Sequence, residues 1–212
     1  MYKRQTHCFG KNVDAAWYYY FANGRYALKM QGFVDLPGEA VRPKPSGEPR
    51  YYSGLDARDN TEMIVTAHHS ILHDVLARRE ELPDIVPVSV PTIPQLRMTR
   101  RLAGPRELDL TDDKRRFQDS VGMIGNWRTK GPVYEIPFSC LHGIEVENLL
   151  TAGRCFSATD AMWEISRVIP ACAVTGEAAG TAAAMLKGRV ADIRIRDLQQ
   201  RLTEQGVVLH LD

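Results

Sequence analysis

The chain has 212 residues, of which 44% are hydrophobic and 25% charged, and its formal net charge is +1. This balance gives no electrostatic reason to expect nucleic-acid or membrane partners. No apolar run approaches the roughly 18 residues of a membrane span, and residues 1–10 contain no apolar signal-peptide core. A cytoplasmic location is therefore expected, with a processed or truncated N-terminus left open.

Residues 8–55 have the pattern of a β-rich segment. Aromatic and apolar clusters at 15–22 and 25–36 are separated by Asn23-Gly24, a pair that favours a two-residue hairpin turn. The run at 37–49, which is rich in proline and glycine, predicts an exposed loop after the hairpin.

A long helix is predicted at 59–82. Asp59 and Glu62 have the spacing of a capping box, and Pro83 ends the helical pattern. Five apolar side chains share one stripe of this helix: Ile64, Ile71, Leu72, Val75 and Leu76.

Three histidines, His68, His69 and His73, lie on the same helix. His69 and His73 are four residues apart, a spacing that places two metal ligands on one face. The sequence lacks the intervening glutamate of a zinc protease motif and offers no obvious third ligand. Surface histidines are the preferred interpretation, and no metal site is predicted.

Residues 86–98 are β-like and interrupted by prolines, and three arginines follow closely: Arg97, Arg100 and Arg101. Such a group is either a solvated edge or an anion clamp, and composition alone favours the edge. Thr111 is expected to cap a short helix at 112–117, which precedes a glycine-containing loop and a β-like run at 133–141.

Residues 148–187 form the segment around which the chain is organised. Four apolar or small residues, 149–152, meet Gly153, which predicts a strand, a tight turn, a loop and then a helix at 170–187. Gly176 and Gly180 each destabilise a helix interior by roughly 1 kcal/mol relative to alanine, so their presence in this helix needs a packing reason. Close packing of helix on sheet is preferred over direct ligand contact. A second helix is predicted at 192–205, with Gly206 as its stop.

The four cysteines are Cys8, Cys140, Cys155 and Cys172, and none forms a CxxC pair. The spacing does not supply the ligands of an iron-sulfur cluster or a structural zinc. Buried reduced thiols are the preferred interpretation.

Several of these motifs, in their order, resemble the FAD-dependent oxidoreductases of the glutathione-reductase-like flavoprotein superfamily, in the branch related to the heterodisulfide reductase flavin subunit. They are EIPF at 135–138, NLLTAGRC at 148–155, Ser157, Arg167-Val168, Pro170 and GEAAGTAA at 176–183. The resemblance extends upstream through LRMTRRLAG at 96–104 and residues 117–122, and it covers roughly the last 120 residues well and the first 90 poorly.

The resemblance implies FAD as the cofactor and a flavin site made by Gly153, Arg154, Ser157, Arg167, Val168 and Ile169. Arg97, Arg100 and Arg101 become candidates for binding an anionic substrate, although no catalytic residue is identified. Relatives of this branch can carry iron-sulfur clusters, whose ligands are not seen here. The implied activity is oxidation or reduction of an unidentified small organic substrate through the flavin.

The glycine-rich GxGxxG turn that holds the pyrophosphate of a dinucleotide is missing. The chain is therefore expected to be the C-terminal part of a longer flavoprotein that lacks its N-terminal dinucleotide-binding segment, and to be inactive alone. The expected fold is α/β, in part α+β, with a β-rich substrate-domain fragment at 1–130 and the C-terminal portion of a Rossmann-like FAD domain at 131–212.

Two alternatives remain open. One is a truncated, non-catalytic chain that binds no flavin by itself. The other is a tRNA-modifying flavoprotein of the same superfamily, which would need a basic surface that the balanced charge does not favour.

Overall fold

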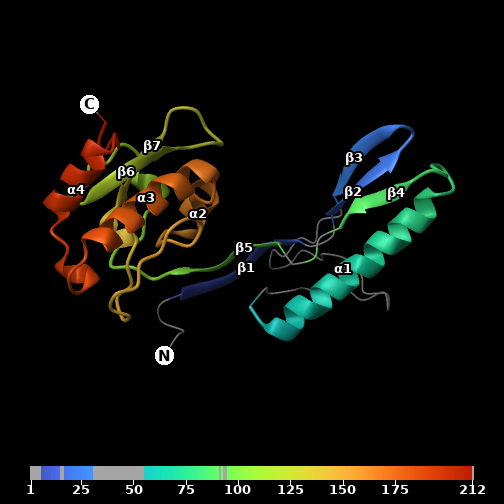
Figure 1. Ribbon diagram of the computed structural model, residues 1–212, viewed down its shortest axis with the longest axis horizontal. Coiled ribbons are helices and arrows are strands. Elements are labelled where there is room, and N and C mark those ends of the chain that lie inside the picture. Colours follow the sequence, from blue (N-terminus) through green and yellow to red (C-terminus); the bar gives the residue numbers. More distant parts are fainter. Residues whose placement is uncertain (1–5, 15–16, 31–54, 91, 93–94, 212) are drawn as a thin grey trace. The chain divides into compact units, whose positions relative to one another are not determined.

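The computed structural model describes residues 6–14, 17–30, 55–90, 92 and 95–211. The chain divides into two compact units, one of residues 8–99 and one of residues 100–212 together with residues 1–7 (Figure 1). The predicted loop at 37–49 lies outside the described residues. Strands β1 (Thr6–Asp14) and β5 (Gln95–Leu102) form a two-stranded sheet.

The unit of residues 8–99 contains a three-stranded sheet. Its strand order is β3 (Arg25–Met30), β2 (Trp17–Ala22), β4 (Val86–Ser89), and both pairings are antiparallel. Asn23 and Gly24 join β2 to β3 with φ angles of 50° and 72°. These are the positive values that a two-residue hairpin turn requires, so the predicted hairpin is confirmed.

Helix α1 (Ala57–Arg78) lies in the same unit. Ile71 and Val75 pack with Ala22 and Ile85 in a small apolar core. Two members of the predicted stripe do not join it, since Leu72 and Leu76 are 55% and 50% exposed. The three helix histidines are exposed as well.

The bounds of α1 differ from the prediction. The helix starts after Asp56, whose carboxylate accepts a hydrogen bond from the Arg58 amide at 2.9 Å, rather than at Asp59. It ends at Arg78, four residues before the predicted end, and the chain then tightens into turns in which the Glu80 and Glu81 amides bond carbonyls three residues back. An aspartate one turn earlier serves as the cap, which spacing alone did not distinguish.

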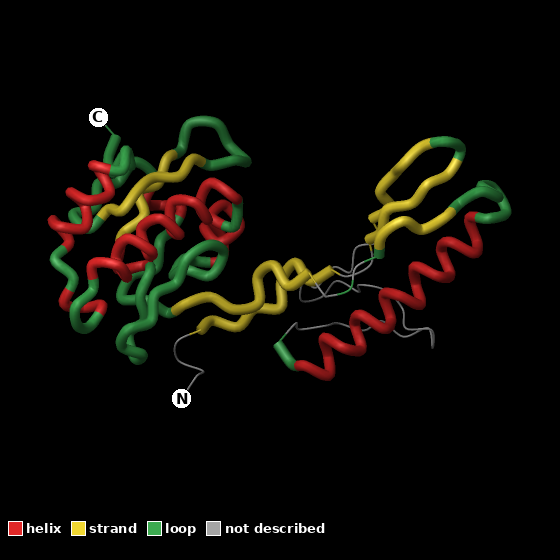
Figure 2. Tube along the Cα trace, viewed as in Figure 1, coloured by secondary structure: helices red, strands yellow, loops and turns green. Residues whose placement is uncertain are grey.

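The unit of residues 100–212 is built on a hairpin. Strands β6 (Ser120–Gly125) and β7 (Val133–Pro137) pair antiparallel, and α3 (Ile169–Met185) and α4 (Ile195–Glu204) pack on β6. Figure 2 shows these helices beside the hairpin. A short helix, α2 (Asp160–Ser166), and three 3-10 turns, η2 (Leu110–Asp112), η3 (Phe138–Cys140) and η4 (Val190–Asp192), complete the unit. The described residues thus form a mixed helix and strand fold.

The close packing of α3 is achieved by a different glycine from those predicted. A Cβ added at Gly176 or Gly180 would meet nothing within 4 Å, so the expected contact of these glycines with a neighbouring element is wrong. The buried face of α3 is instead made by Ala171, Thr175, Ala178, Ala179 and Ala182. The glycine needed for close approach is Gly122 on β6, where an added Cβ would overlap Val174 of α3.

Four further expectations are corrected. Residues 149–152 form no strand, and Leu150 makes only an isolated bridge to His142. The helix predicted at 112–117 does not form, and only the 3-10 turn η2 at 110–112 is present. It is capped by Asp109 rather than Thr111, because the Asp109 carboxylate accepts from the Thr111 amide. Helix α4 starts at Ile195 because η4 occupies the preceding residues, while its predicted stop at Gly206, with a φ of 92°, is confirmed.

The division between the compact units falls between Thr99 and Arg100, while the boundary near residue 130 between a substrate domain and a FAD domain stays a prediction. The pairing of β6 with β7 joins residues 120–125 to 133–137 and keeps both on the C-terminal side of the division.

Among the described residues, no single helix is long and apolar enough to cross a membrane. Only α2 and α3 taken together meet that criterion, and they are bent by 93°.

Candidate functional site

The turn at Gly153 is held against α3 by one buried side chain. Gly153 has a φ of 76°, a conformation that favours glycine. Its amide donates to Thr175 Oγ1 at 2.8 Å, and the same hydroxyl donates to the Ala171 carbonyl at 2.6 Å. Because Thr175 is fully buried, the turn is locked to the first turns of α3.

A second buried side chain fixes the next residue of the turn. The indole Nε1 of Trp163 in α2 donates to the Arg154 carbonyl. Trp163 is 1% exposed, whereas the Arg154 side chain is exposed. The backbone of Arg154 is thus anchored while its guanidinium faces solvent. Sequence reasoning missed both Trp163 and Thr175. For Thr175 the available signal was its place as a polar residue inside an alanine-rich helix.

The junction of α2 and α3 brings the other predicted flavin residues together. Arg167 ends α2, and Val168 is the N-cap of α3 with no side-chain cap hydrogen bond. Ile169 begins α3 and is 85% exposed. The first amides of a helix have no intrahelical acceptor. The α3 start therefore presents backbone donors and the positive end of a helix dipole.

Arg101 is placed differently from the other predicted arginines. Its side chain is 4% exposed and donates to Asp160 at 2.7 Å and to Glu107 at 3.4 Å. Its guanidinium carbon also lies 5.2 Å from the centre of the Trp163 ring. These contacts fasten the end of β5 to the start of α2 and give Arg101 a packing role. Arg100 is exposed, and the side chain of Arg97 lies outside the described residues.

Ser157 lies away from solvent. It is fully buried, and its hydroxyl accepts from the Gly104 amide at 3.1 Å. A Cβ at Gly104 would lie 2.8 Å from the Ser139 carbonyl oxygen, which shows how closely the segments approach. A contact between Ser157 and a cofactor would require this packing to open.

Two cysteines flank the Gly153 turn. The Cys172 sulfur lies 3.6 Å from the position of a Cβ on Gly153, and Cys155 Sγ lies 3.6 Å from the Ala152 carbonyl oxygen. Burial raises the pKa of the Cys155 thiol above its ordinary value, and the nearby Arg154 charge opposes that shift. Burial likewise raises the pKa of Cys140, which is fully buried in η3. All three thiols are free.

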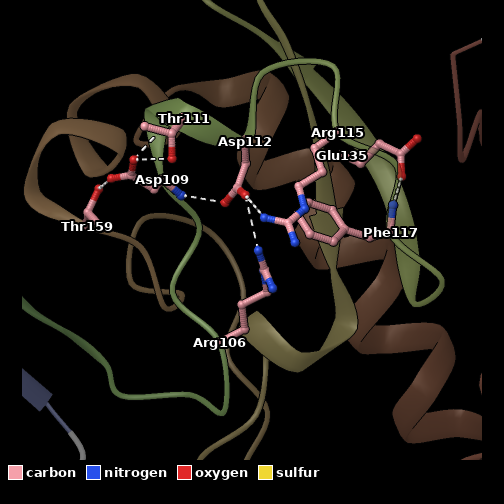
Figure 3. A network of polar contacts seen from close by, with 8 residues as sticks. All are labelled: Arg106, Asp109, Thr111, Asp112, Arg115, Phe117, Glu135 and Thr159. Atoms are coloured by element: carbon pink, nitrogen blue, oxygen red, sulfur yellow. Dashed lines mark hydrogen bonds and ion pairs between the residues drawn. The ribbon is translucent and has the colours of Figure 1, made fainter.

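A polar network supports the segment before β6, and sequence reasoning did not identify it (Figure 3). The Asp112 side chain is only 5% exposed and forms ion pairs with Arg106 at 3.1 Å and Arg115 at 3.0 Å. Both guanidiniums lie over the Phe117 ring, at 4.3 and 5.3 Å.

Asp109 extends this network toward α2. Its carboxylate accepts from the Thr159 hydroxyl at 2.7 Å, and Thr159 is the N-cap of α2. The hydrogen bond from Thr159, with those from Thr111, lowers the pKa of Asp109. The network ties the loop of residues 106–117 to the start of α2.

The donor set around Gly153 and the α3 start fits a flavin. A glycine with positive φ, an exposed arginine and an uncapped helix start offer backbone and cationic donors to an electron-rich ring and its polar chain. Ser157 is the predicted member that does not contribute to this surface. In the part of the chain that the structure describes, no group of three His, Cys, Asp or Glu side chains gathers as a metal site would.

Comparison with protein-family models gives a match to the FAD dependent oxidoreductases over residues 19–202, which is most of the chain. Searches of curated proteins and of solved structures each returned no match. The family match agrees with the flavin resemblance of residues 148–183. The chain therefore belongs to the FAD-dependent oxidoreductase family, and FAD is the cofactor that this family uses.

Proposed function

We propose that this chain forms the C-terminal part of a FAD-dependent oxidoreductase of the branch related to the heterodisulfide reductase flavin subunit. The observation that carries the proposal is the double anchoring of one turn beside an open helix start. Thr175 of α3 and Trp163 of α2 fix the backbone of Gly153 and Arg154. The uncapped start of α3 lies at the junction of these two helices. Such preorganised donors suit a ring that gains negative charge on reduction.

Each residue of this site has a proposed role. Gly153 lets the backbone approach the cofactor, and the exposed Arg154 guanidinium bonds the ribityl chain or a phosphate. Arg167 and the amides of Val168 and Ile169 face the pyrimidine end of the ring. When bound, FAD supplies the electron-accepting chemistry through which a small organic substrate is oxidised or reduced.

We propose an anionic substrate, with Arg97 and Arg100 as its binding candidates. Arg101 is left out because its guanidinium is already held by Asp160 and Glu107 inside the protein. No GxGxxG turn occurs among the 212 residues. The diphosphate would therefore be held by a dinucleotide-binding segment outside this sequence, and the chain alone would be inactive and colourless as purified.

The test is a titration of the isotope-labelled chain with riboflavin and, separately, with FAD, followed by backbone amide NMR. Both ligands should perturb the amides of Arg154, Val168 and Ile169. Their affinities should be similar, because this chain would hold the ring half of the cofactor and not its diphosphate. Perturbation confined to other parts of the chain would contradict the proposed site.

A matched pair of variants separates the site from general charge. Arg167→Ala should weaken riboflavin binding, whereas Arg194→Ala, at an arginine paired with Asp197 at the start of α4, should not. Equal effects of the two changes would argue against a role for Arg167. Tight, stoichiometric retention of FAD by the chain would refute the proposal that the diphosphate site lies elsewhere.

A further inference from the structure

A hollow on the C-terminal unit lies where three segments meet. It has a volume of about 830 Å³ and is bordered by the loop of residues 116–119, the first half of α4 and His210. The side chains used below are those of Arg116, Asp119, Arg196, Gln199 and His210. Its volume is within the usual range of small-molecule pockets, roughly 300 to 1,000 Å³.

The walls of the hollow are fixed by two buried or half-buried polar side chains. The Gln199 amide donates both protons to the backbone, to the Gln118 carbonyl at 2.9 Å and the Ser120 carbonyl at 3.0 Å. Glu135, which is buried, accepts from the Phe117 amide at 2.7 Å and holds His210 Nδ1 at 2.9 Å. The loop, α4 and the C-terminal segment are therefore tied to one another.

The carboxylates near the hollow make hydrogen bonds to the protein, and one of them, half-buried Asp119, also lines the hollow. Asp119 accepts from the Ser139 amide at 3.0 Å, and both oxygens of Glu135 are used by Phe117 and His210. By contrast, Arg116 and Arg196 are exposed, and neither has an ion-pair partner among the described residues. The hollow is therefore lined by two exposed guanidiniums against one half-buried carboxylate, an excess of positive charge on a chain that is nearly neutral.

His210 adds a ring nitrogen, Nε2, to the two guanidiniums, because Glu135 holds its other ring nitrogen. An ionised carboxylate only accepts, so the pairing with Glu135 puts the imidazole proton on Nδ1. Nε2 is then the ring nitrogen left for a ligand. It accepts a hydrogen bond from a protonated phosphate oxygen or, in the imidazolium form, donates one.

We propose that this hollow binds a phosphorylated small molecule, whose phosphate contacts Arg116, Arg196 and His210. Arginine forks match the oxygens of phosphate, and two arginines with one imidazole surround a compact, multiply charged group. The remaining volume accommodates the organic part of the ligand. The site is formed by the loop of residues 116–119, α4 and His210, and it does not depend on the proposed flavin site.

The test uses inorganic phosphate as the probe, with the isotope-labelled 212-residue chain in flavin-free buffer. Phosphate should bind saturably and shift the side-chain Nε–H signals of Arg116 and Arg196 together. Each of Arg116→Gln and Arg196→Gln should weaken binding about tenfold or more, as expected for loss of a charge-assisted contact. Arg194→Gln, two residues before Arg196, is the control and should leave binding unchanged.

Three results would overturn the proposal. These are shifts that remain linear in phosphate concentration, arginine variants that bind within about twofold of the parent, and tighter binding of succinate than of glycerol phosphate. Urea midpoints of the variants, which should equal that of the parent, exclude loss of binding through unfolding. Because no flavin is present, failure here would leave the riboflavin titration unaffected, and the converse also holds.

Discussion

Gly122→Ala should be among the most damaging single-methyl additions in the C-terminal unit. Gly122 has a φ of 147°, and an added Cβ would overlap Cγ1 of Val174 on α3. An L side chain in such a conformation costs about 1 to 3 kcal/mol. Overpacking of helix against strand costs about 1 to 3 kcal/mol more. The expected loss is therefore about 2 to 6 kcal/mol, a large part of the roughly 5 to 15 kcal/mol of a typical domain.

Two glycines serve as matched controls. Gly125, on the same strand β6, has open space around an added Cβ, so Gly125→Ala should change stability little. Gly180, inside α3, is also open, and Gly180→Ala should stabilise by about 0.5 to 1 kcal/mol because alanine is the better helix former.

Urea unfolding of the full chain, followed by far-UV circular dichroism, measures the three midpoints. The order Gly180→Ala above the parent, Gly125→Ala near it and Gly122→Ala well below it would support the reasoning. A Gly122→Ala midpoint equal to that of the parent would refute it. So would destabilisation by Gly180→Ala, which would show that the glycine face of α3 is covered after all.

Arg101→Met should destabilise the chain by about 1 to 3 kcal/mol, since hydrogen bonds from a charged group to partly exposed carboxylates are lost; an unchanged urea midpoint would contradict the packing role of Arg101. The pKa of Asp109 is lower in the folded chain than its ordinary value of 3.8. Its carboxylate therefore contributes to the free energy of unfolding at pH values above 3.8, and this contribution is lost as the pH falls through the folded-state pKa. The midpoint difference between the parent and Asp109→Asn should therefore shrink below about pH 4, and a pH-independent difference would count against the Thr159 hydrogen bond as its source. The raised pKa of Cys155 predicts slow alkylation by iodoacetamide at neutral pH, accelerating as pH rises; rapid reaction at neutral pH would show that Arg154 outweighs burial.

Local signals in the sequence were sufficient for several elements. Asn23-Gly24 predicted a hairpin because few other residues tolerate positive φ at both turn positions. The α3 helix was predicted to within two residues, since Pro170 suits a first turn and the alanine-rich run suits its interior. The order of motifs at 135–183 also predicted the FAD-dependent oxidoreductase family, which the family match confirms.

Other features depend on contacts that spacing cannot reveal. Gly176 and Gly180 had the spacing of a packing motif, but the close approach is made by Gly122, on a strand more than fifty residues earlier in the chain. Arg101 and Ser157 had the chemistry of ligand-binding residues. Burial and the partners brought to them by the fold gave Arg101 an ion pair with Asp160 and gave Ser157 a bond to Gly104.

The sequence by itself thus determined the Asn23-Gly24 turn, helix α3 and the family, because these follow from backbone preferences and from residue types at fixed local spacing. The tertiary structure decided which polar side chains are used internally and which face solvent. Thr175 and Trp163 anchor the Gly153 turn, and Glu135 orients His210, through hydrogen bonds between residues up to 75 positions apart. Such bonds arise only when packing excludes water from the side chains that make them.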